Sequence, residues 1–144
     1  MEKITLKLLE FYNLDAELNG LPSPDGKEML MQGLLKEKLS IVVKYWLNDL
    51  AKRVKAEREE VESLKNDLIK KYGKEDENGN ISIPMFLEEE TRTINPDYVE
   101  FDREFGKLLQ TEKELEYKPL KLSDFENLET ESNYATFFKL VVPE

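Results

Sequence analysis

The chain has 144 residues and a formal net charge of −10, with 31 Asp and Glu against 21 Lys and Arg. It contains neither cysteine nor histidine, which excludes disulfides, thiolate nucleophiles, zinc–thiolate sites and every catalytic arrangement that needs an imidazole. The balance of 36% charged and 40% apolar residues is typical of a folded, helix-rich protein, and we predict one domain over residues 1–144.

The charge is distributed unevenly along the chain. Residues 1–33 sum to −3, residues 34–73 to +3 and residues 74–144 to −10. Such acidity argues against general coating of nucleic acid through phosphate contacts. No N-terminal segment joins a basic start to a long apolar run, so we predict no signal peptide and no membrane span. Together with the lack of cysteine, this favours a reducing cytoplasm as the location.

The first thirty residues contain three local signals. Residues 3–8 alternate apolar and polar side chains, which predicts a half-buried strand. From Leu9 the apolar spacing becomes helical, and Gly20 follows as a C-terminal stop. Turn-forming residues dominate 21–26, so we expect an exposed loop and then a short extended piece at 29–31.

The segment 34–72 contains neither proline nor glycine, and Gly73 stands where a left-handed helix cap is expected. Its apolar residues recur every three or four positions, so we predict one helix of about 34–72, with Trp46 in the core. Four further apolar residues, Leu35, Ile41, Val42 and Tyr45, widen the first half on several sides. The second half keeps only a narrow, coiled-coil-like seam and is expected to form an arm.

The next segment is polar and rich in turn signals. Asn78-Gly79 before an Ile-Ser-Ile run predicts a tight turn. The spacing approaches that of a calcium-binding loop, but Lys74 and Met85 fall where acids are needed, so the turn is the preferred interpretation. We expect the acidic run 88–90 to be a solvated connector.

Asn95-Pro96 has the form of a helix start, an N-cap residue followed by proline at the first helical position. Apolar residues then keep helical spacing at Tyr98, Phe101, Phe105, Leu108 and Leu115. We therefore predict a second helix of about 96–115 that returns antiparallel along the 34–72 helix.

The two ends of the chain resemble each other. Residues 6–15 and 120–129 are identical at six of ten positions, which is compatible with duplication or with chance similarity. We expect the second copy to be a strand that turns into a short helix with a Ser123/Glu126 capping box. Ser132 is expected to cap a last turn before a strand at 140–142.

These elements predict an α+β, mostly helical fold. In it, a long antiparallel helical hairpin stands beside a small sheet formed by short strands near both termini. The apolar first half of the long helix needs cover on more than one side, so we also predict a homo-oligomer, most simply a two-fold dimer.

Two groups of side chains are candidate sites. The basic cluster Lys52, Arg53, Lys55 and Arg58 is a candidate site for one anionic group, although pairing with acids on neighbouring elements, or plain solvation, explains it as well. Asp97, Glu100 and Glu104 are candidate carboxylates for a divalent metal, at spacings that occur on nearly any charged helix. We predict no catalytic residue, metal ligand or cofactor.

Four segments together resemble small uncharacterised proteins encoded by tailed bacteriophages. They are the strand 4–7, the helix start 33–38, the turn 72–79 and the late strand 120–122. The resemblance implies a phage or prophage origin and a place in the host-cell cytoplasm or in the virion.

Three functions follow as hypotheses. The first is a non-enzymatic accessory protein that blocks or sequesters a host component, such as a defence factor or its nucleotide signal. The second is a virion or assembly component that uses the helical arm as its contact. The third is an enzyme that uses paired carboxylates and a divalent metal.

Overall fold

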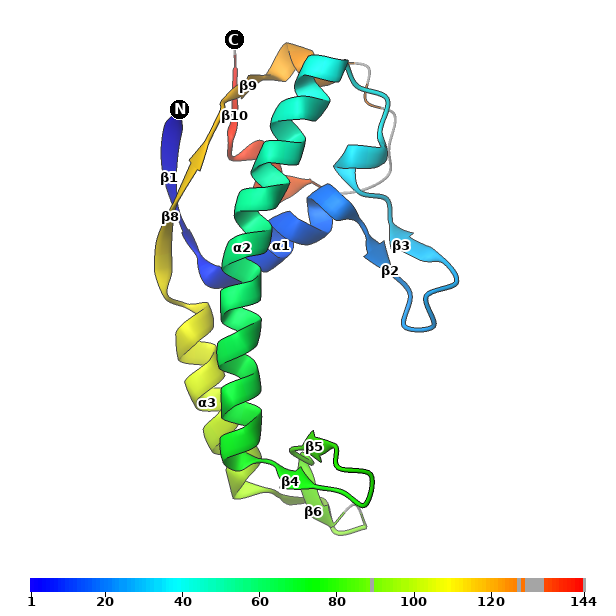
Figure 1. The fold of residues 1–144 in the computed structure, drawn as a ribbon, viewed down its shortest axis with the longest axis vertical. Coiled ribbons are helices and arrows are strands. Elements are labelled where there is room, and N and C mark those ends of the chain that lie inside the picture. The colour runs from blue at the N-terminus through cyan, green and yellow to red at the C-terminus, as the bar shows by residue number, and fades with distance from the viewer. Residues whose placement is uncertain (89, 127, 129–133, 144) are drawn as a thin grey trace. The chain divides into compact units, whose positions relative to one another are not determined.

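The computed structural model describes residues 1–88, 90–126, 128 and 134–143 (Figure 1). It confirms an α+β fold with four helices in the described residues, α1 (Leu8–Asn19), α2 (Ile41–Tyr72), α3 (Pro96–Leu109) and α4 (Ala135–Phe138). The strands pair into small two-stranded sheets. The chain divides into two compact units, one of residues 1–58 and 112–144 and one of residues 59–111, so the boundary falls within α2.

Both chain ends form strands, but in different sheets. The predicted first strand is confirmed as β1 (Glu2–Lys7), which pairs antiparallel with β8 (Glu112–Tyr117). The last strand, β10 (Val141–Val142), pairs parallel with β9 (Leu120–Lys121). The prediction that the terminal strands share one sheet is therefore wrong. In the register of the first ladder Tyr117 pairs with Glu2, so β1 has no residue left to pair with Pro119, which lies between β8 and β9.

The second helix is shorter than the predicted 96–115. It ends at Leu109, and the Thr111 hydroxyl donates to the Lys107 carbonyl just beyond that end. Leu115 belongs to β8 and is buried opposite Ile4 of β1. Leu115 follows Leu108 by seven positions in the sequence, a spacing that fits a helix. Pairing with β1, a strand of equal length, nevertheless stabilises the extended form of this segment.

The long helix begins seven residues later than predicted. Leu34–Lys36 form one turn of 3-10 helix, and α2 starts at Ile41, where the Ser40 hydroxyl accepts from the Val43 amide at 3.2 Å. Ser40 is a good N-cap residue, and a lack of proline and glycine does not by itself make a helix. The buried Glu37 carboxylate accepts a hydrogen bond from the Tyr134 hydroxyl at 3.0 Å. This bond holds the segment between the 3-10 turn and α2 in a non-helical conformation.

The end of α2 at Tyr72 is confirmed, but Gly73 is not a left-handed cap. The glycines with positive φ in the described residues are Gly20, Gly26 and Gly79. A Cβ at Gly73 would lie 2.7 Å from Cγ2 of Ile81 and would also clash with the Ile69 carbonyl oxygen. Glycine is needed there because two segments approach closely.

The first unit holds most of the core. One face of α2 contributes Val43, Leu47, Leu50 and Val54, all buried at three- and four-residue spacing. They belong to an apolar core that also includes Leu6, Leu8, Phe11, Leu14, Leu18, Leu34, Leu115, Phe125, Tyr134, Phe137 and Leu140. Trp46 is half-buried, so the prediction that it belongs to the core is wrong.

Two more predictions about this unit are confirmed. α1 covers the expected helical segment, and Gly20 ends it with φ 89°. The loop that follows leads to the expected extended piece, β3 (Met29–Met31), which pairs with β2 (Leu21–Pro22).

The similar segments at the two ends adopt the same local structure where they are described. In the first, the Lys7 amide donates to the Glu10 carboxylate; in the second, the Lys121 amide donates to the Asp124 carboxylate. The second copy is a strand followed by a 3-10 helix, Leu122–Phe125, as expected. The expected Ser123/Glu126 capping box is wrong, because Asp124 provides the cap. Ser132 lies outside the described residues.

The second unit is built from hairpins and two helices. The predicted turn is confirmed between β4 (Lys74–Glu75) and β5 (Ile81–Ser82), with the Asp76 carboxylate accepting from the Asn78 and Asn80 amides. The expected connector at 88–90 is partly wrong. β6 (Phe86–Glu88) pairs with β7 (Thr93–Ile94), although residue 89 lies outside the described residues.

α3 lies beside the second half of α2, which confirms the helical hairpin in this shorter form (Figure 1). Lys71 pairs with Glu104 at 3.6 Å, and the Lys65 ammonium lies 5.5 Å from the ring centre of Phe105. The predicted N-cap is also confirmed. The Asn95 side chain accepts from the Asp97 amide and donates to the Pro84 carbonyl, which ties the start of α3 to the segment before β6.

Candidate functional site

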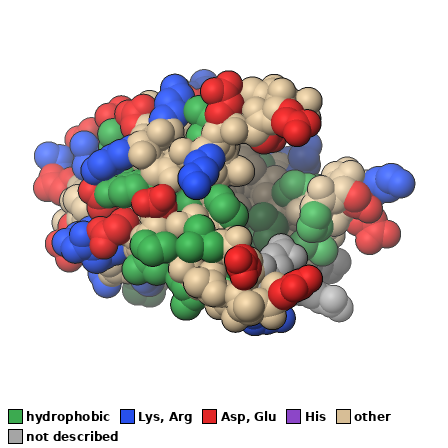
Figure 2. Space-filling view, turned by 90° about the horizontal axis from the view of Figure 1, so that it is seen from below, with side chains coloured by type: hydrophobic (Ala, Val, Ile, Leu, Met, Phe, Trp, Pro, Cys, Tyr) green, Lys and Arg blue, Asp and Glu red, His purple; other side chains and the backbone are tan. Residues whose placement is uncertain are grey.

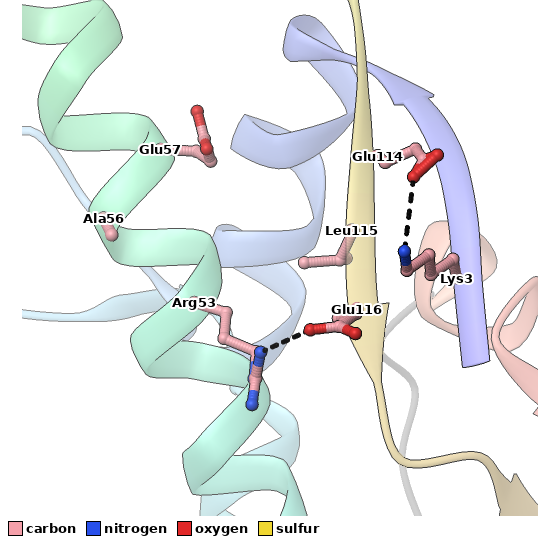
Figure 3. Close-up of a pocket in the computed structure, with 7 residues that line it drawn as sticks. All are labelled: Lys3, Arg53, Ala56, Glu57, Glu114, Leu115 and Glu116. Carbon is pink, nitrogen blue, oxygen red and sulfur yellow. Dashed lines mark ion pairs between the residues drawn. The ribbon is translucent and has the colours of Figure 1, made fainter. Parts of the chain in front are cut away.

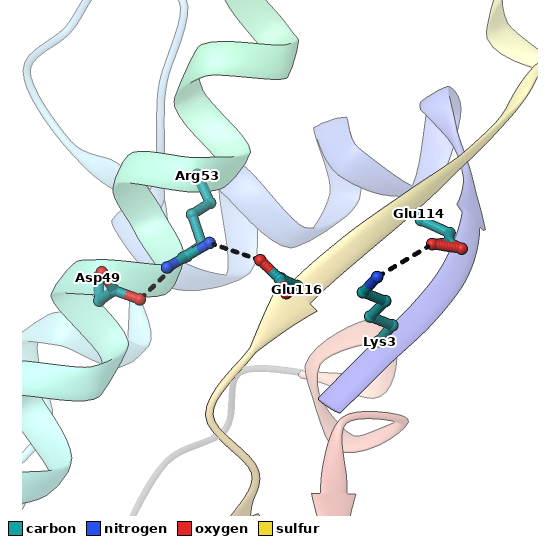
Figure 4. Close-up of polar contacts among 5 residues, drawn as sticks. All are labelled: Lys3, Asp49, Arg53, Glu114 and Glu116. Carbon is teal, nitrogen blue, oxygen red and sulfur yellow. Dashed lines mark hydrogen bonds and ion pairs between the residues drawn. The ribbon is translucent and has the colours of Figure 1, made fainter. Parts of the chain in front are cut away.

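Arg53 lines an open groove between α2 and the β1–β8 ladder, with a volume of about 420 Å³ (Figure 3). Its guanidinium bonds to Asp49 at 2.9 Å, one turn earlier on α2, and lies 3.6 Å from Glu116 on β8 (Figure 4). On the other side of the groove Lys3 pairs with Glu114 at 4.0 Å. Carboxylates of the chain itself therefore surround the Arg53 charge.

A fourth ion pair belongs to this network. Lys113 of β8 lies 3.4 Å from Glu57 on the next turn of α2. Each pair is substantially exposed to solvent, so it contributes little stability by itself. An anion that entered the groove would meet three carboxylates and two cations among the residues that line it. The groove is therefore better suited to holding α2 against the ladder than to binding a phosphate.

Arg58 points to a different place. Its guanidinium donates to the buried Asp15 carboxylate of α1 at 2.6 Å and lies 5.3 Å from the ring centre of Tyr12. Five residues separate Arg53 from Arg58, which places them about 140° apart around the helix. Their charges cannot converge on one ligand without breaking both sets of contacts.

The other two members of the basic cluster, Lys52 and Lys55, are exposed on α2. For the two arginines the contacts agree with the pairing interpretation rather than with an anion site. A site for one anionic group at Lys52, Arg53, Lys55 and Arg58 stays a prediction.

The three candidate carboxylates of α3 do not converge. Glu100 pairs with Arg103, Glu104 pairs with Lys71, and Asp97 is exposed in the first turn. The nearby Tyr72 hydroxyl and the Lys71 ammonium lower the pKa of Glu104, which disfavours a general acid at neutral pH. Within the described part of the chain, no three Asp or Glu side chains gather as metal ligands. No helix there is long and apolar enough to cross a bilayer.

The surface of the second unit carries a small, mainly apolar pocket. A pocket of about 250 Å³ is lined by Met85, Phe86, Ile94, Tyr98, Val99 and Asp102. It is smaller than the roughly 300–1,000 Å³ of small-molecule sites, which suits one apolar anchor side chain. Apolar groups reach the surface between acidic and basic ones in the view of Figure 2.

Three of the side chains that line this pocket are exposed apolar residues: Met85 (50%), Ile94 (57%) and Val99 (49%). Acidic residues accompany them. The sequence from 85 to 102 has six Asp and Glu against one arginine, and that arginine, Arg92, lies over the Phe86 ring. We call Met85, Ile94, Val99 and Asp102 the acidic apolar surface.

The first unit carries an apolar surface of the opposite charge. Ile41 (82% exposed), Val42 (63%) and Tyr45 (64%) begin an outward stripe on α2 that continues at helical spacing to Lys52. The Tyr45 ring contacts Trp46 edge to face, and the Lys118 ammonium lies 5.9 Å from the Trp46 ring centre. We call Ile41, Val42, Tyr45, Lys52 and Lys118 the basic apolar surface.

Sequence reasoning missed the acidic apolar surface, because β6 and β7 were expected to be an irregular connector. Alternation around Phe86 and Ile94 was the available signal, but each strand has three residues or fewer. The buried carboxylates Asp15, Glu17 and Glu37 were also missed, since nothing in the local pattern shows that distant groups satisfy them. Glu17, for example, accepts from the Phe137 amide at 3.1 Å.

Comparison with known proteins gives no match to a family model, a curated protein or a solved structure. The functional argument therefore rests on the surfaces described above.

Proposed function

We propose that the protein acts without catalysis, by binding a host protein, and that it is a phage or prophage accessory protein in the host cytoplasm. The observation that supports this most is the acidic apolar surface, where three exposed apolar side chains line a pocket of about 250 Å³, which fits one apolar side chain of a partner. Exposed apolar groups in such a cluster, rather than singly, are a feature of protein-binding surfaces.

The surrounding charge indicates the chemistry of the partner. Asp102 is exposed and lines the pocket together with the apolar side chains. A host protein that presents an apolar anchor flanked by Lys or Arg matches this surface in both shape and charge. A basic host site that normally receives an acidic ligand is one example of such a target, and blocking it would inhibit the host component.

The test is capture from infected cells with three forms of the protein. Ile94→Arg removes an exposed apolar group and reverses the local charge, while Leu30→Arg makes the same change at a 65% exposed position on β3 in the other unit. Wild type and Leu30→Arg are expected to retain the same host protein, and Ile94→Arg to lose it. Binding must then be reproduced with the purified partner. Equal retention by all three forms would show that this surface is not the contact.

The virion or assembly role remains the second candidate, because the same surface can contact a phage protein. Mass spectrometry of purified particles separates the two. A stoichiometric amount in particles, with no host partner retained, favours the virion role. The nucleotide-signal version depends on the predicted anion site and is tested by nucleotide binding with Lys52→Ala and Lys55→Ala variants.

A further inference from the structure

We propose that the basic apolar surface of one copy docks onto the acidic apolar surface of a second copy. The proposal uses the surface on which the proposed function rests, and names the chain itself as one occupant of it. The contact is heterologous, since it joins two different patches of the same sequence.

The first argument is that both patches consist of apolar side chains that are largely exposed in the part of the chain that the structure describes. Ile41, at 82%, is the most exposed large apolar side chain in the described residues, and Val42 and Tyr45 follow it on the same helix. The patch of the second unit has three apolar side chains that are about half exposed. Burial of apolar surface of this kind is worth about 25 cal/mol per Å², which provides the driving force for association.

The second argument is charge. Lys52 continues the outward stripe of α2, and Lys118 lies over Trp46 beside it. The other patch has Asp102 among the residues that line its pocket. A contact between two basic patches would place lysines of both copies together, and a contact between two acidic patches would do the same with aspartates. Docking of a basic patch onto an acidic patch avoids both repulsions, because it brings opposite charges together.

The third argument is size and shape. The pocket of about 250 Å³ is concave and apolar, and the start of α2 presents Ile41 and Tyr45 one helical turn apart. A helix that lays such side chains into an apolar groove is a common recognition mode. One of the two inserts into the pocket, and the lysines face Asp102.

The test mixes two charge-reversing variants. Ile41→Glu disables the basic apolar surface, and an acid in the first turn of α2 is favourable for the helix. Ile94→Arg disables the acidic apolar surface. Each variant keeps one intact patch, so each alone should be a monomer near 16.9 kDa in sedimentation or light scattering. Mixed in equal amounts, they should form a one-to-one complex, because one intact patch of each kind is present.

Wild type should associate at micromolar concentration, and Leu30→Glu, a matched change on β3, should associate equally. Association should weaken as salt rises, because the screening length falls from about 10 Å at 0.1 M to about 3 Å at 1 M. A wild-type monomer, association of either single variant alone, or a mixture that forms no complex would each overturn the proposal. Host capture is scored separately, so loss of self-association with retained capture refutes only this inference, and the reverse refutes only the proposed function.

Discussion

Phe11 and Trp46 show how differently two aromatic side chains contribute to the same unit. Phe11 is 1% exposed at the centre of α1, whereas Trp46 is half-buried and touches Tyr45 and Lys118 from the surface of α2. A large side chain in an apolar stripe is not automatically in the core. What decides is the face of the helix on which it lies.

Phe11→Ala should therefore lower the free energy of unfolding by about 3–5 kcal/mol, through lost burial and a residual cavity. Trp46→Ala should lower the free energy of unfolding by only about 1–2 kcal/mol, because it removes mainly the aromatic contact and a partly buried surface. Urea unfolding followed by circular dichroism measures both, since Trp46 is the one tryptophan and its fluorescence is lost in the second variant. Equal costs would show that Trp46 is buried in solution.

Glu10 connects the start of α1 to the segment after α4. The Lys139 ammonium, at 2.6 Å, and then the Lys7 amide lower the pKa of its carboxyl from the ordinary 4.5. The ionised form is thus stabilised by folding. That stabilisation is complete above the unfolded pKa near 4.5 and is lost as the pH falls through the lower folded pKa.

Glu10→Gln keeps an oxygen that can accept from the Lys7 amide but removes the charge. The substitution should lower the free energy of unfolding by roughly 0.2–1 kcal/mol at pH 7, as expected for a partly exposed ion pair. The difference from wild type should shrink as the pH falls below about 4.5. Urea midpoints over this range measure it, with Glu60→Gln on the exposed side of α2 as control. A difference that stays constant with pH would contradict the assigned role of the charge.

At the scale of single elements, the helix ends depend on local caps and on close approaches. Ser40 and Asn95 accept backbone hydrogen bonds at the starts of α2 and α3. Gly73 and Gly106 look equivalent in the sequence but differ in surroundings. Gly73 has no room for a side chain, while a Cβ at Gly106, inside α3, would meet nothing within 4 Å.

Gly106→Ala should stabilise the protein by about 0.5–1 kcal/mol, because alanine loses less backbone freedom in a helix than glycine does. Gly73→Ala should destabilise it, because a Cβ would clash with backbone of α2 and with Ile81. The two variants have the same change in composition, so they control for each other in thermal or urea unfolding. A stabilising effect at Gly73 would show that β4 and β5 are not held against the end of α2.

At the scale of the whole molecule, buried side chains are concentrated in one of the two units. The unit of residues 59–111 has only Val61 and Asn95 buried among its described residues. The unit of residues 1–58 and 112–144 contains the apolar core and the buried carboxylates. Regions with few buried apolar contacts open locally at lower free energy.

Amide hydrogen exchange should therefore differ along α2. Amides at 47–54 should exchange about tenfold or more slowly than amides at 64–72, although both belong to one helix. Exchange measured by NMR resolves the two groups. Uniform protection of amides over the whole helix would mean that another molecule covers the second unit in solution. Repeating the measurement with Ile41→Glu would then show whether a second copy of the chain provides this cover.

The sequence by itself determined the elements whose signals are local. Alternation predicted β1, capping residues predicted the start of α3, and Asn78-Gly79 predicted the turn between β4 and β5. These structures depend on backbone preferences and on hydrogen bonds within a few residues, which the local order of side chains specifies.

The tertiary structure alone decided what depends on a distant partner. Residues 112–117 form a strand because β1 pairs with them. The segment just before α2 is not part of that helix, because Glu37 accepts a hydrogen bond from the distant Tyr134 hydroxyl. Arg53 and Arg58 look like one basic cluster, yet Glu116 and Asp15 draw them to different elements. Both apolar surfaces were also decided at this level, since an apolar residue is exposed only where no other part of the chain covers it.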